Sequence, residues 1–206
     1  MAFADTAHMD MVDTYLDEIE RAIRQIDRVA VRAVVDELFA CWQRGGTAYL
    51  IGNGGSAATA SHMMNDLMKC TLVDGRPRFR AMALTDNVAA MTAFANDLAY
   101  EEIFVEPLRT HLDARDVVVG ISGSGNSPNV LRAIAFASEL GARTVGLCGD
   151  TGGKLATLVD VAVKIPAARI GQQEDGHLVL NHTIALALYD RIAATPARGA
   201  MAYAGS

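Results

Sequence analysis

Ile121-Ser122-Gly123-Ser124-Gly125-Asn126-Ser127-Pro128 is the stretch of sequence that decides the fold, because it joins a predicted strand to a predicted helix. The strand is Val117–Ile121, a short run of apolar and mostly β-branched residues that is typical of a buried strand. Pro128 suits the first position of a helix, and Pro128–Leu140 follows with helical spacing. The stretch therefore predicts one strand-loop-helix unit of an α/β protein.

A second unit of the same kind lies earlier in the chain. The apolar run Ala48–Ile51 leads into Gly52-Asn53-Gly54-Gly55-Ser56, and a helical pattern over Ala57–Lys69 follows. Short apolar runs and helical patterns continue to alternate, which predicts a parallel sheet covered on both faces, with ligands at the carboxyl ends of the strands. The other strands are predicted at Arg80–Leu84, Thr144–Leu147 and Val161–Ile165, and the other helices at Val88–Ala95, Glu101–Leu112 and Glu174–Ala194.

The first 46 residues differ from the rest because they show only helical periodicity. Apolar residues from Val12 to Ile26 recur at alternating spacings of four and three, and a second apolar series runs from Val31 to Phe39 before Gly45-Gly46. We expect a helical hairpin over residues 1–46 that packs on the core and on a neighbouring subunit, followed by one domain over residues 47–206.

Composition excludes several classes of function. The chain has 206 residues, is 51% hydrophobic and carries a net charge of −6, so it lacks the basic footprint of a nucleic-acid-binding protein. No apolar run reaches transmembrane length, and the N-terminus does not have the layout of a signal peptide. Cys41, Cys70 and Cys148 are widely spaced and odd in number, which favours reduced thiols. We expect a cytoplasmic protein that binds neither nucleic acid nor membrane.

The serine-glycine loop has the chemistry of a phosphate cradle. Glycines let backbone N–H groups approach a ligand, and the following helix N-terminus attracts an anion. Ser122, Ser124 and Ser127 add three neutral hydroxyls, so an acidic protein could hold a phosphate here without a lysine. The same residue types also occur in ordinary strand-to-helix turns, where they only cap the helix. The loop is not a Walker A motif, because no Gly-Lys-Ser/Thr follows.

The earlier loop also fits a dinucleotide-binding fingerprint, which is an alternative. Gly52 to Ala57 matches G-x-G-x-x-A, and Asp74 lies at about the required distance. In that fingerprint the acidic residue closes the second strand, whereas Asp74 precedes the second strand within a polar turn. The position of Asp74 therefore disfavours nicotinamide binding.

Taken together, the two loops resemble the sugar isomerase (SIS) family, and in particular its phosphoheptose isomerases. Gly52–Ala58 with Ser61-His62 resembles the first SIS motif, and Ile121–Ser127 resembles the second. Further similarity lies at Thr85-Asp86-Asn87, Ala95-Asn96-Asp97 and Gly149–Lys154. The resemblance implies a three-layer αβα sandwich with a five-stranded parallel sheet. It also implies a homotetramer with active sites between subunits, and isomerisation of sedoheptulose 7-phosphate to D-glycero-D-manno-heptose 7-phosphate through an enediol.

The resemblance also assigns site residues. His62 and Asp66 share one helix face at i and i+4, and Glu174 lies eight residues before His182. Family members place a His, a carboxylate, a Gln and a His at these positions, where they bind zinc and perform acid–base chemistry. Asp66 would take the proton and His182 would donate or relay one, although the two roles could be exchanged. The implied sugar-phosphate contacts are Asn53, Gly54, Gly55, Ser56, Asn96, Asp97, Ser122, Gly123, Ser124, Ser127 and Glu174.

The chain departs from the family pattern at three of these positions. Asp66 replaces a Glu, and Gly123 stands where the family often has Thr, so one hydroxyl is missing. Counting back from His182 places Glu174 at the Gln position, and Gln173 takes it only if one residue is inserted. Two alternatives stay open. One is a non-catalytic SIS regulator of the DnaA initiator-associating type, which would lack the carboxylate–histidine pair. The other is an isomerase of a different sugar phosphate.

Overall fold

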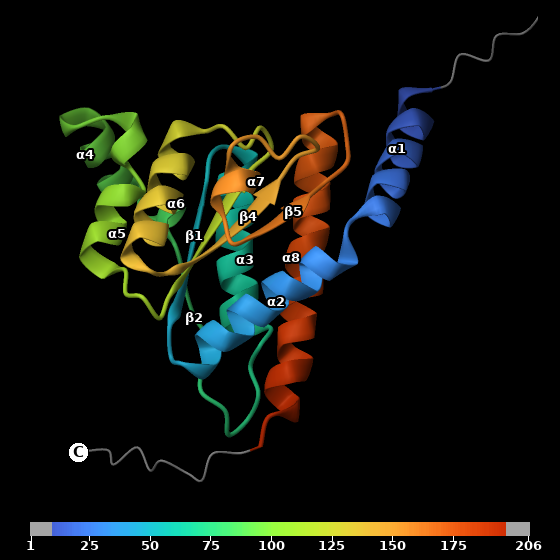
Figure 1. Ribbon diagram of the computed structural model, residues 1–206. Coiled ribbons are helices and arrows are strands. Elements are labelled where there is room, and N and C mark those ends of the chain that lie inside the picture. Colours follow the sequence, from blue (N-terminus) through green and yellow to red (C-terminus); the bar gives the residue numbers. More distant parts are fainter. Residues whose placement is uncertain (1–9, 197–206) are drawn as a thin grey trace, which may run out of the picture.

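The computed structural model describes residues 10–196, and its centre is a parallel sheet with strand order β2-β1-β3-β4-β5 (Figure 1). β1 and β3 are neighbours, with Gly52 paired to Ile121, so the two glycine-bearing loops leave the sheet side by side. Successive strands are added outward from this pair in both directions, which makes it the topological switch point where α/β proteins bind ligands. The strands are β1 (Thr47–Gly52), β2 (Arg80–Ala83), β3 (Val117–Ser122), β4 (Arg143–Cys148) and β5 (Val161–Lys164).

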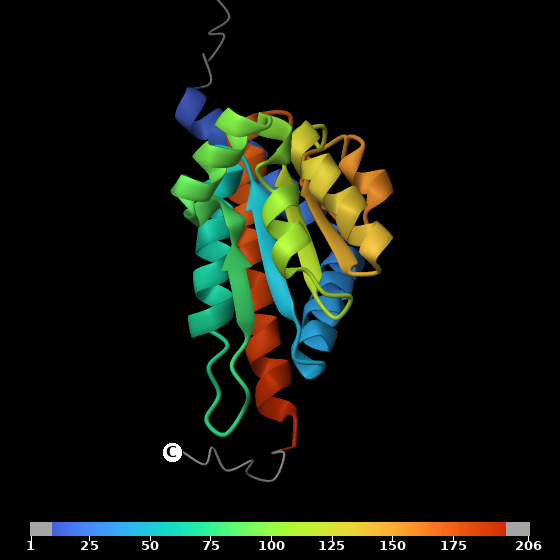
Figure 2. The same cartoon turned by 90° about the vertical axis from the view of Figure 1, so that its left-hand side faces the viewer.

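Helices cover both faces of the sheet, which confirms the three-layer αβα sandwich (Figures 1 and 2). One face carries α2 (Arg28–Gln43), α3 (Gly55–Lys69) and α8 (Ile170–Ala194), and α1 (Met11–Gln25) packs on α8. The other face carries α4 (Val88–Asp97), α5 (Val105–His111), α6 (Pro128–Leu140) and α7 (Leu155–Leu158). Short 3-10 turns lie at Leu84–Asp86 and Tyr100–Glu102.

Alternation along the central strand explains why the sheet is buried on both sides. Val117, Val119 and Ile121 point into the core under α2, α3 and α8, whereas Val118 points into the core under α5 and α6. Every residue of β3 is buried, as expected for a parallel strand between two helical layers. The continuous apolar run in the sequence therefore reflects two separate cores.

Three predicted elements need correction. The helix expected at Glu101–Leu112 is divided into the 3-10 turn and α5, because Pro107 cannot donate a backbone hydrogen bond and must lie within the first turn of a helix. The last helix begins at Ile170, four residues before the predicted start, and the short α7 was not predicted. The two N-terminal helices are confirmed, but they do not form the expected hairpin. The chain turns at Ile26-Asp27, and each helix packs against α8 (Figure 1).

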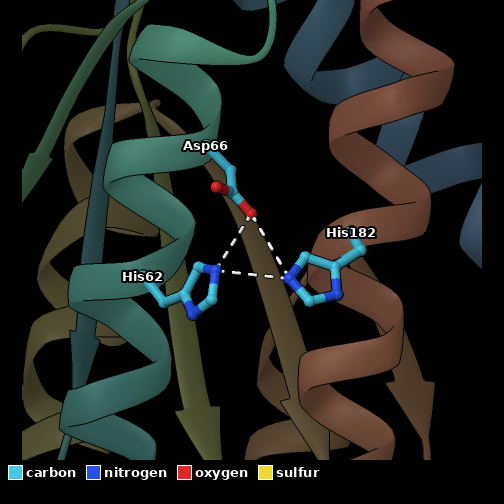
Figure 3. A group of neighbouring side chains, drawn as sticks. All are labelled: His62, Asp66 and His182. Carbon is cyan, nitrogen blue, oxygen red and sulfur yellow. Dashed lines mark hydrogen bonds and ion pairs between the residues drawn. The ribbon is translucent and has the colours of Figure 1, made fainter.

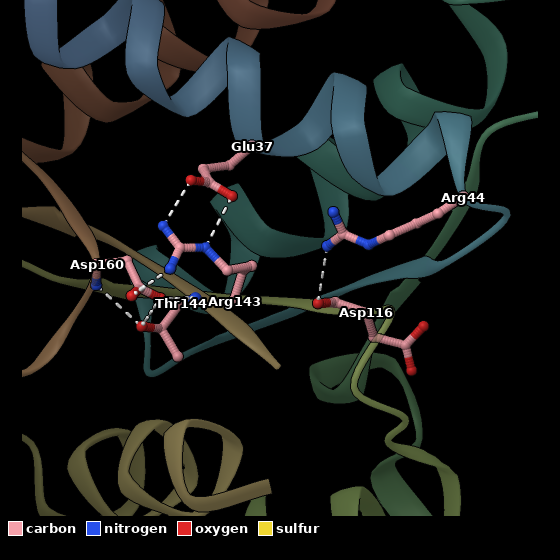
Figure 4. A network of polar contacts seen from close by, with 6 residues as sticks. All are labelled: Glu37, Arg44, Asp116, Arg143, Thr144 and Asp160. Atoms are coloured by element: carbon pink, nitrogen blue, oxygen red, sulfur yellow. Dashed lines mark hydrogen bonds and ion pairs between the residues drawn. The ribbon is translucent and has the colours of Figure 1, made fainter. Parts of the chain in front are cut away.

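A polar network ties the strands together at the edge opposite the two loops (Figure 4). The Arg143 guanidinium donates two hydrogen bonds to Glu37 of α2 (2.6 and 3.0 Å) and one to Asp160 (2.7 Å). Asp160 also accepts from the backbone N–H of Thr144 at 2.8 Å. These contacts fix α2 and the starts of β4 and β5, which leaves the carboxyl edge of the sheet free for a ligand. Among residues 10–196, no helix is both long enough and apolar enough to cross a membrane.

Candidate active site

A cavity of about 310 Å³ lies at the carboxyl ends of β1 and β3, where the two glycine-bearing loops meet. Within the described part of the chain, none of the residues that line it is a lysine or an arginine. An anion bound here would therefore depend on hydroxyls, backbone N–H groups and the N-termini of α3 and α6. The lining residues are Asn53, Gly54, Gly55, Ser56, Ile121, Ser122, Gly123, Ser124, Ser127, Ile170 and Glu174.

The three serine hydroxyls of the second loop converge in this cavity. Ser122 Oγ lies 3.2 Å from Ser127 Oγ and 3.5 Å from Ser124 Oγ. A hydrogen bond within the loop holds its shape: the backbone N–H of Gly125 donates to Ser122 Oγ at 3.1 Å. Gly125 has a φ of +63°, which a residue with a side chain rarely adopts. A rigid cluster of neutral donors is thus formed within a single chain.

Asn53, from the first loop, is held by two residues that the sequence reasoning missed. Asn53 and Asn129 exchange side-chain amide hydrogen bonds of 2.9 and 2.8 Å, and the Tyr100 hydroxyl donates to Asn53 Oδ1 at 3.0 Å. Asn129 is 1% exposed. The sequence did offer one signal for Asn129: it directly follows Pro128, at the start of the helix after the serine-glycine loop. These contacts link the two loops across the switch point.

Glu174 lines the cavity at the start of α3. A Cβ added to Gly55 would lie 2.3 Å from Glu174 Oε1, so the carboxylate rests directly against the start of α3. Gln173 does not line the cavity: its Nε2 donates to the carbonyl of Ala167 at 2.8 Å, and its Oε1 packs behind Gly123 and Gly149. Of the two candidates for this position, Glu174 is therefore the residue that lines the cavity.

Asn96 and Asp97 are not brought to this cavity. They lie at the exposed C-terminal end of α4, and Asn96 Nδ2 donates to Asp97 Oδ1 at 2.7 Å. Their contact with a sugar phosphate stays a prediction.

A second cluster joins α3 to α8 and contains His62, Asp66 and His182 (Figure 3). Asp66 Oδ2 lies 3.4 Å from His62 Nε2 and 3.7 Å from His182 Nε2, and the two Nε2 atoms are 3.2 Å apart. Asp66 is 6% exposed, whereas both imidazoles are about half exposed. Three donor atoms from residues far apart in the sequence thus converge at the edge of the core.

The donor set fits a divalent metal ion. Zinc accepts imidazole nitrogens and carboxylate oxygens, and ligand atoms about 2.1 Å from a tetrahedral ion lie about 3.4 Å from one another. The three observed separations are close to that value. Catalytic zinc sites use three protein ligands and keep one position open. Glu174, predicted as a fourth ligand, does not belong to this group of three.

Two further polar residues of α8 are buried, and one of them contacts this cluster. Asn181 Nδ2 donates to Asp66 Oδ2 at 3.0 Å, and His177 Nε2 donates to the backbone carbonyl of Cys148 at 3.0 Å. Burial lowers the pKa of His177 from its usual value because the charged ring would lose its hydration. His177 is thus a neutral structural residue. The contact of Asn181 with Asp66 was not predicted from the sequence.

Comparison with known proteins identifies the family of the chain. Residues 14–149 match the family model described as the SIS domain, so the chain belongs to the SIS domain family. Within it, the chain belongs to the phosphoheptose isomerases. It is 37% identical over 165 residues to the phosphoheptose isomerase of Aneurinibacillus thermoaerophilus, covering 80% of each protein. It is 36% identical over 184 residues to that of Mycobacterium tuberculosis, covering 89% of this chain and 93% of the relative.

Solved structures give the same result. The phosphoheptose isomerase of Neisseria gonorrhoeae superposes with a TM-score of 0.81 at 30% identity, over 87% of this chain and 97% of the other. The sugar isomerase domain of an RpiR transcription factor from Sphaerobacter thermophilus matches at 17% identity with a TM-score of 0.64, over 88% of each chain. That likeness concerns the fold alone.

Proposed function

We propose that the chain is an aldose–ketose isomerase that converts sedoheptulose 7-phosphate to D-glycero-D-manno-heptose 7-phosphate through an enediol. The observation that carries the proposal is the buried Asp66 carboxylate, whose Oδ2 faces two imidazole nitrogens at 3.4 and 3.7 Å. Moving a proton between adjacent carbons requires a base, an acid and stabilisation of an enediolate. The relatives named phosphoheptose isomerase support the choice of substrate.

The cavity between the two loops would hold the phosphate. Ser122, Ser124 and Ser127 offer hydroxyls, and the N-termini of α3 and α6 offer backbone N–H groups and the positive ends of their dipoles. This part of the substrate does not react, so its binding energy serves to orient the reacting end. Glu174 reaches the same cavity and would contact sugar hydroxyls.

Proton transfer would be carried out by residues of α3 and α8. In the ketose-to-aldose direction, Asp66 removes a proton from the carbon beside the carbonyl, and His182 donates or relays one. The roles can be exchanged, because the reaction is reversible. The half-exposed His182 is accessible to substrate, whereas Asp66 is screened from bulk water by its burial.

His62, Asp66 and His182 are also the residues that would hold a divalent cation, which we propose to be zinc. Such an ion, when bound, polarises the carbonyl oxygen and stabilises negative charge on the enediolate. Glu174 remains a predicted fourth ligand, although its carboxylate rests against Gly55 and not beside the three donors.

We further propose a homotetramer with sites completed between subunits. Val179, Leu186 and Tyr189 leave apolar side chains 40–64% exposed on α8, the helix that also carries the half-exposed His182. A face of this kind is typical of a subunit contact. Residues 1–46 are proposed to share in this assembly, as the unit that precedes the SIS domain over residues 47–206. The free thiols of Cys41, Cys70 and Cys148 favour a cytoplasmic location.

The rival function, a non-catalytic SIS regulator, would not need a carboxylate buried between two imidazoles. A different sugar phosphate remains the second alternative. Both are tested by incubating the protein with a panel of ketose phosphates, with and without added zinc, and following aldose phosphate formation. We expect aldoheptose 7-phosphate to form fastest from sedoheptulose 7-phosphate, and zinc to increase the rate. Absence of turnover on every ketose phosphate with zinc supplied would favour the regulator.

A further inference from the structure

Asn181 lies at the centre of the α3–α8 contact and reaches the cluster of three from its buried side. Its side chain is 0% exposed, and its Nδ2 donates to Asp66 Oδ2 at 3.0 Å. This is the same oxygen that faces His62 Nε2 and His182 Nε2 (Figure 3). One carboxylate oxygen therefore has an amide donor behind it and two imidazoles in front of it.

The other half of the Asn181 amide is unsatisfied. Among residues 10–196, its Oδ1 has no hydrogen-bond partner although it is fully buried. Leu180, Ile184 and Ala185, its neighbours along α8, are buried apolar residues. A buried acceptor without a partner opposes folding, and an apolar residue of similar shape would avoid that cost. The amide is thus poorly explained as a packing residue, and its single hydrogen bond to Asp66 is what distinguishes it from a leucine.

The sequence of α8 couples this amide to the exposed imidazole. Asn181 and His182 are consecutive, so they project about 100° apart from the same helical turn. Asn181 faces the core and His182 faces the half-exposed surface, with Asp66 Oδ2 between them. A single turn of α8 thus contacts this oxygen from two sides.

We propose that Asn181 is a positioning residue that fixes the orientation of the Asp66 carboxylate toward His62 and His182, and through it the metal affinity and turnover of the site. The inference rests on the proposed function for its activity readout. Within residues 10–196, Asp66 Oδ1 is held only by Asn65 Nδ2 at 3.2 Å and by the longer contact from Cys70 Sγ at 3.7 Å. Without Asn181, the terminal torsion of Asp66 is free to turn Oδ2 away from the imidazoles.

The test uses Asn181→Leu and Asn181→Ala. Both substitutions remove the donor, but leucine is larger than asparagine and alanine is smaller. Thr183→Val is the matched control, because in the described part of the chain the Thr183 hydroxyl bonds only to the Val179 carbonyl of its own helix. The first readout is the zinc dissociation constant of the full chain, measured by competition with a chromophoric chelator. The second is the division of the effect between kcat and KM with sedoheptulose 7-phosphate.

In both Asn181 variants we expect zinc binding to weaken by about 10- to 100-fold, as for other residues that orient metal ligands. We expect kcat to fall by a comparable factor while KM stays within about twofold, because the phosphate cavity lies elsewhere, and Thr183→Val to match wild type. A residue that only packs would lower the unfolding temperature and leave zinc affinity unchanged. Zinc binding within twofold of wild type in either folded variant overturns the proposal. If wild-type protein isomerises no substrate, the proposed function fails, and the zinc titration still decides the role of Asn181.

Discussion

At the scale of single residues, phosphate recognition depends on hydroxyls that carry no charge. Ser124→Ala and Ser127→Ala each remove one neutral donor from the cavity, so we expect each to weaken binding of sedoheptulose 7-phosphate by about 0.5–2 kcal/mol. Titration calorimetry measures this directly. Ser138→Ala, an exposed serine of α6, is the control. Unchanged affinity in both cavity variants would contradict the assignment of the cradle.

The buried histidine makes stability depend on pH. His177 has a pKa below its usual value in the folded protein, whereas in the unfolded chain it titrates near pH 6.5. The unfolded state therefore binds the extra proton as pH falls, so the contribution is fully present above about pH 6.5 and is lost below it. In urea unfolding between pH 7.5 and 5.5, we expect His177→Gln to reduce the pH dependence by up to about 1.4 kcal/mol per pH unit. An identical slope in wild type and variant would show that His177 is not neutral in the fold.

At the scale of elements, the start of α3 must come close to α8. A Cβ at Gly55 would displace the Glu174 carboxylate, which is the end of a flexible side chain, whereas one at Gly46 would meet the Arg115 backbone carbonyl at 2.1 Å. We therefore expect Gly55→Ala to raise KM for the sugar phosphate with little loss of stability. Gly46→Ala should do the reverse, lowering the unfolding temperature without altering KM. Thermal unfolding and steady-state kinetics of the two variants measure both effects. An unchanged KM in Gly55→Ala would contradict a contact between Glu174 and the substrate.

The opposite edge of the sheet should affect stability alone. Arg143 is partly exposed and pairs with both Glu37 and Asp160, so we expect Arg143→Ala to lower the free energy of unfolding by about 1–2 kcal/mol while leaving KM unchanged (Figure 4). Arg24→Ala removes an exposed helical pair and should cost less than about 0.5 kcal/mol. Denaturant unfolding compares the two. Equal losses would mean that the network does not hold the strands together.

The elements were predictable where a local signal exists. Strand positions follow from apolar runs, and the two loops follow from glycine, serine and Pro128. The spacing of His62 and Asp66 identified one half of the cluster, and the family resemblance supplied His182. Asn129, Tyr100 and Asn181 were not found, because each acts through a partner far away in sequence: Asn53 for the first two and Asp66 for the third. Their role appears only when the packing of α8 on α3, and the position of the start of α6 beside the loop after β1, are known.

At the scale of the whole molecule, we expect four chains in solution. The exposed apolar residues of α8, the helix that carries His182, would be covered in a symmetric assembly. Light scattering on dilute protein should give a mass about four times the 21.9 kDa of the chain. A monomer of 21.9 kDa that still turns over substrate would contradict sites shared between subunits.

Solvent deuterium incorporation tests the central claim most directly, because an enediol reaction passes a proton through the enzyme. Sedoheptulose 7-phosphate is incubated in deuterium oxide with the zinc-supplied protein, and the product is followed by NMR. We expect deuterium on the carbon next to the new carbonyl, and Asp66→Asn should slow its appearance by about a hundred- to ten-thousand-fold while the sugar phosphate still binds. Isomerisation at the wild-type rate in Asp66→Asn would contradict proton transfer by Asp66, and product formed without deuterium would contradict delivery of a solvent-exchanged proton by His182.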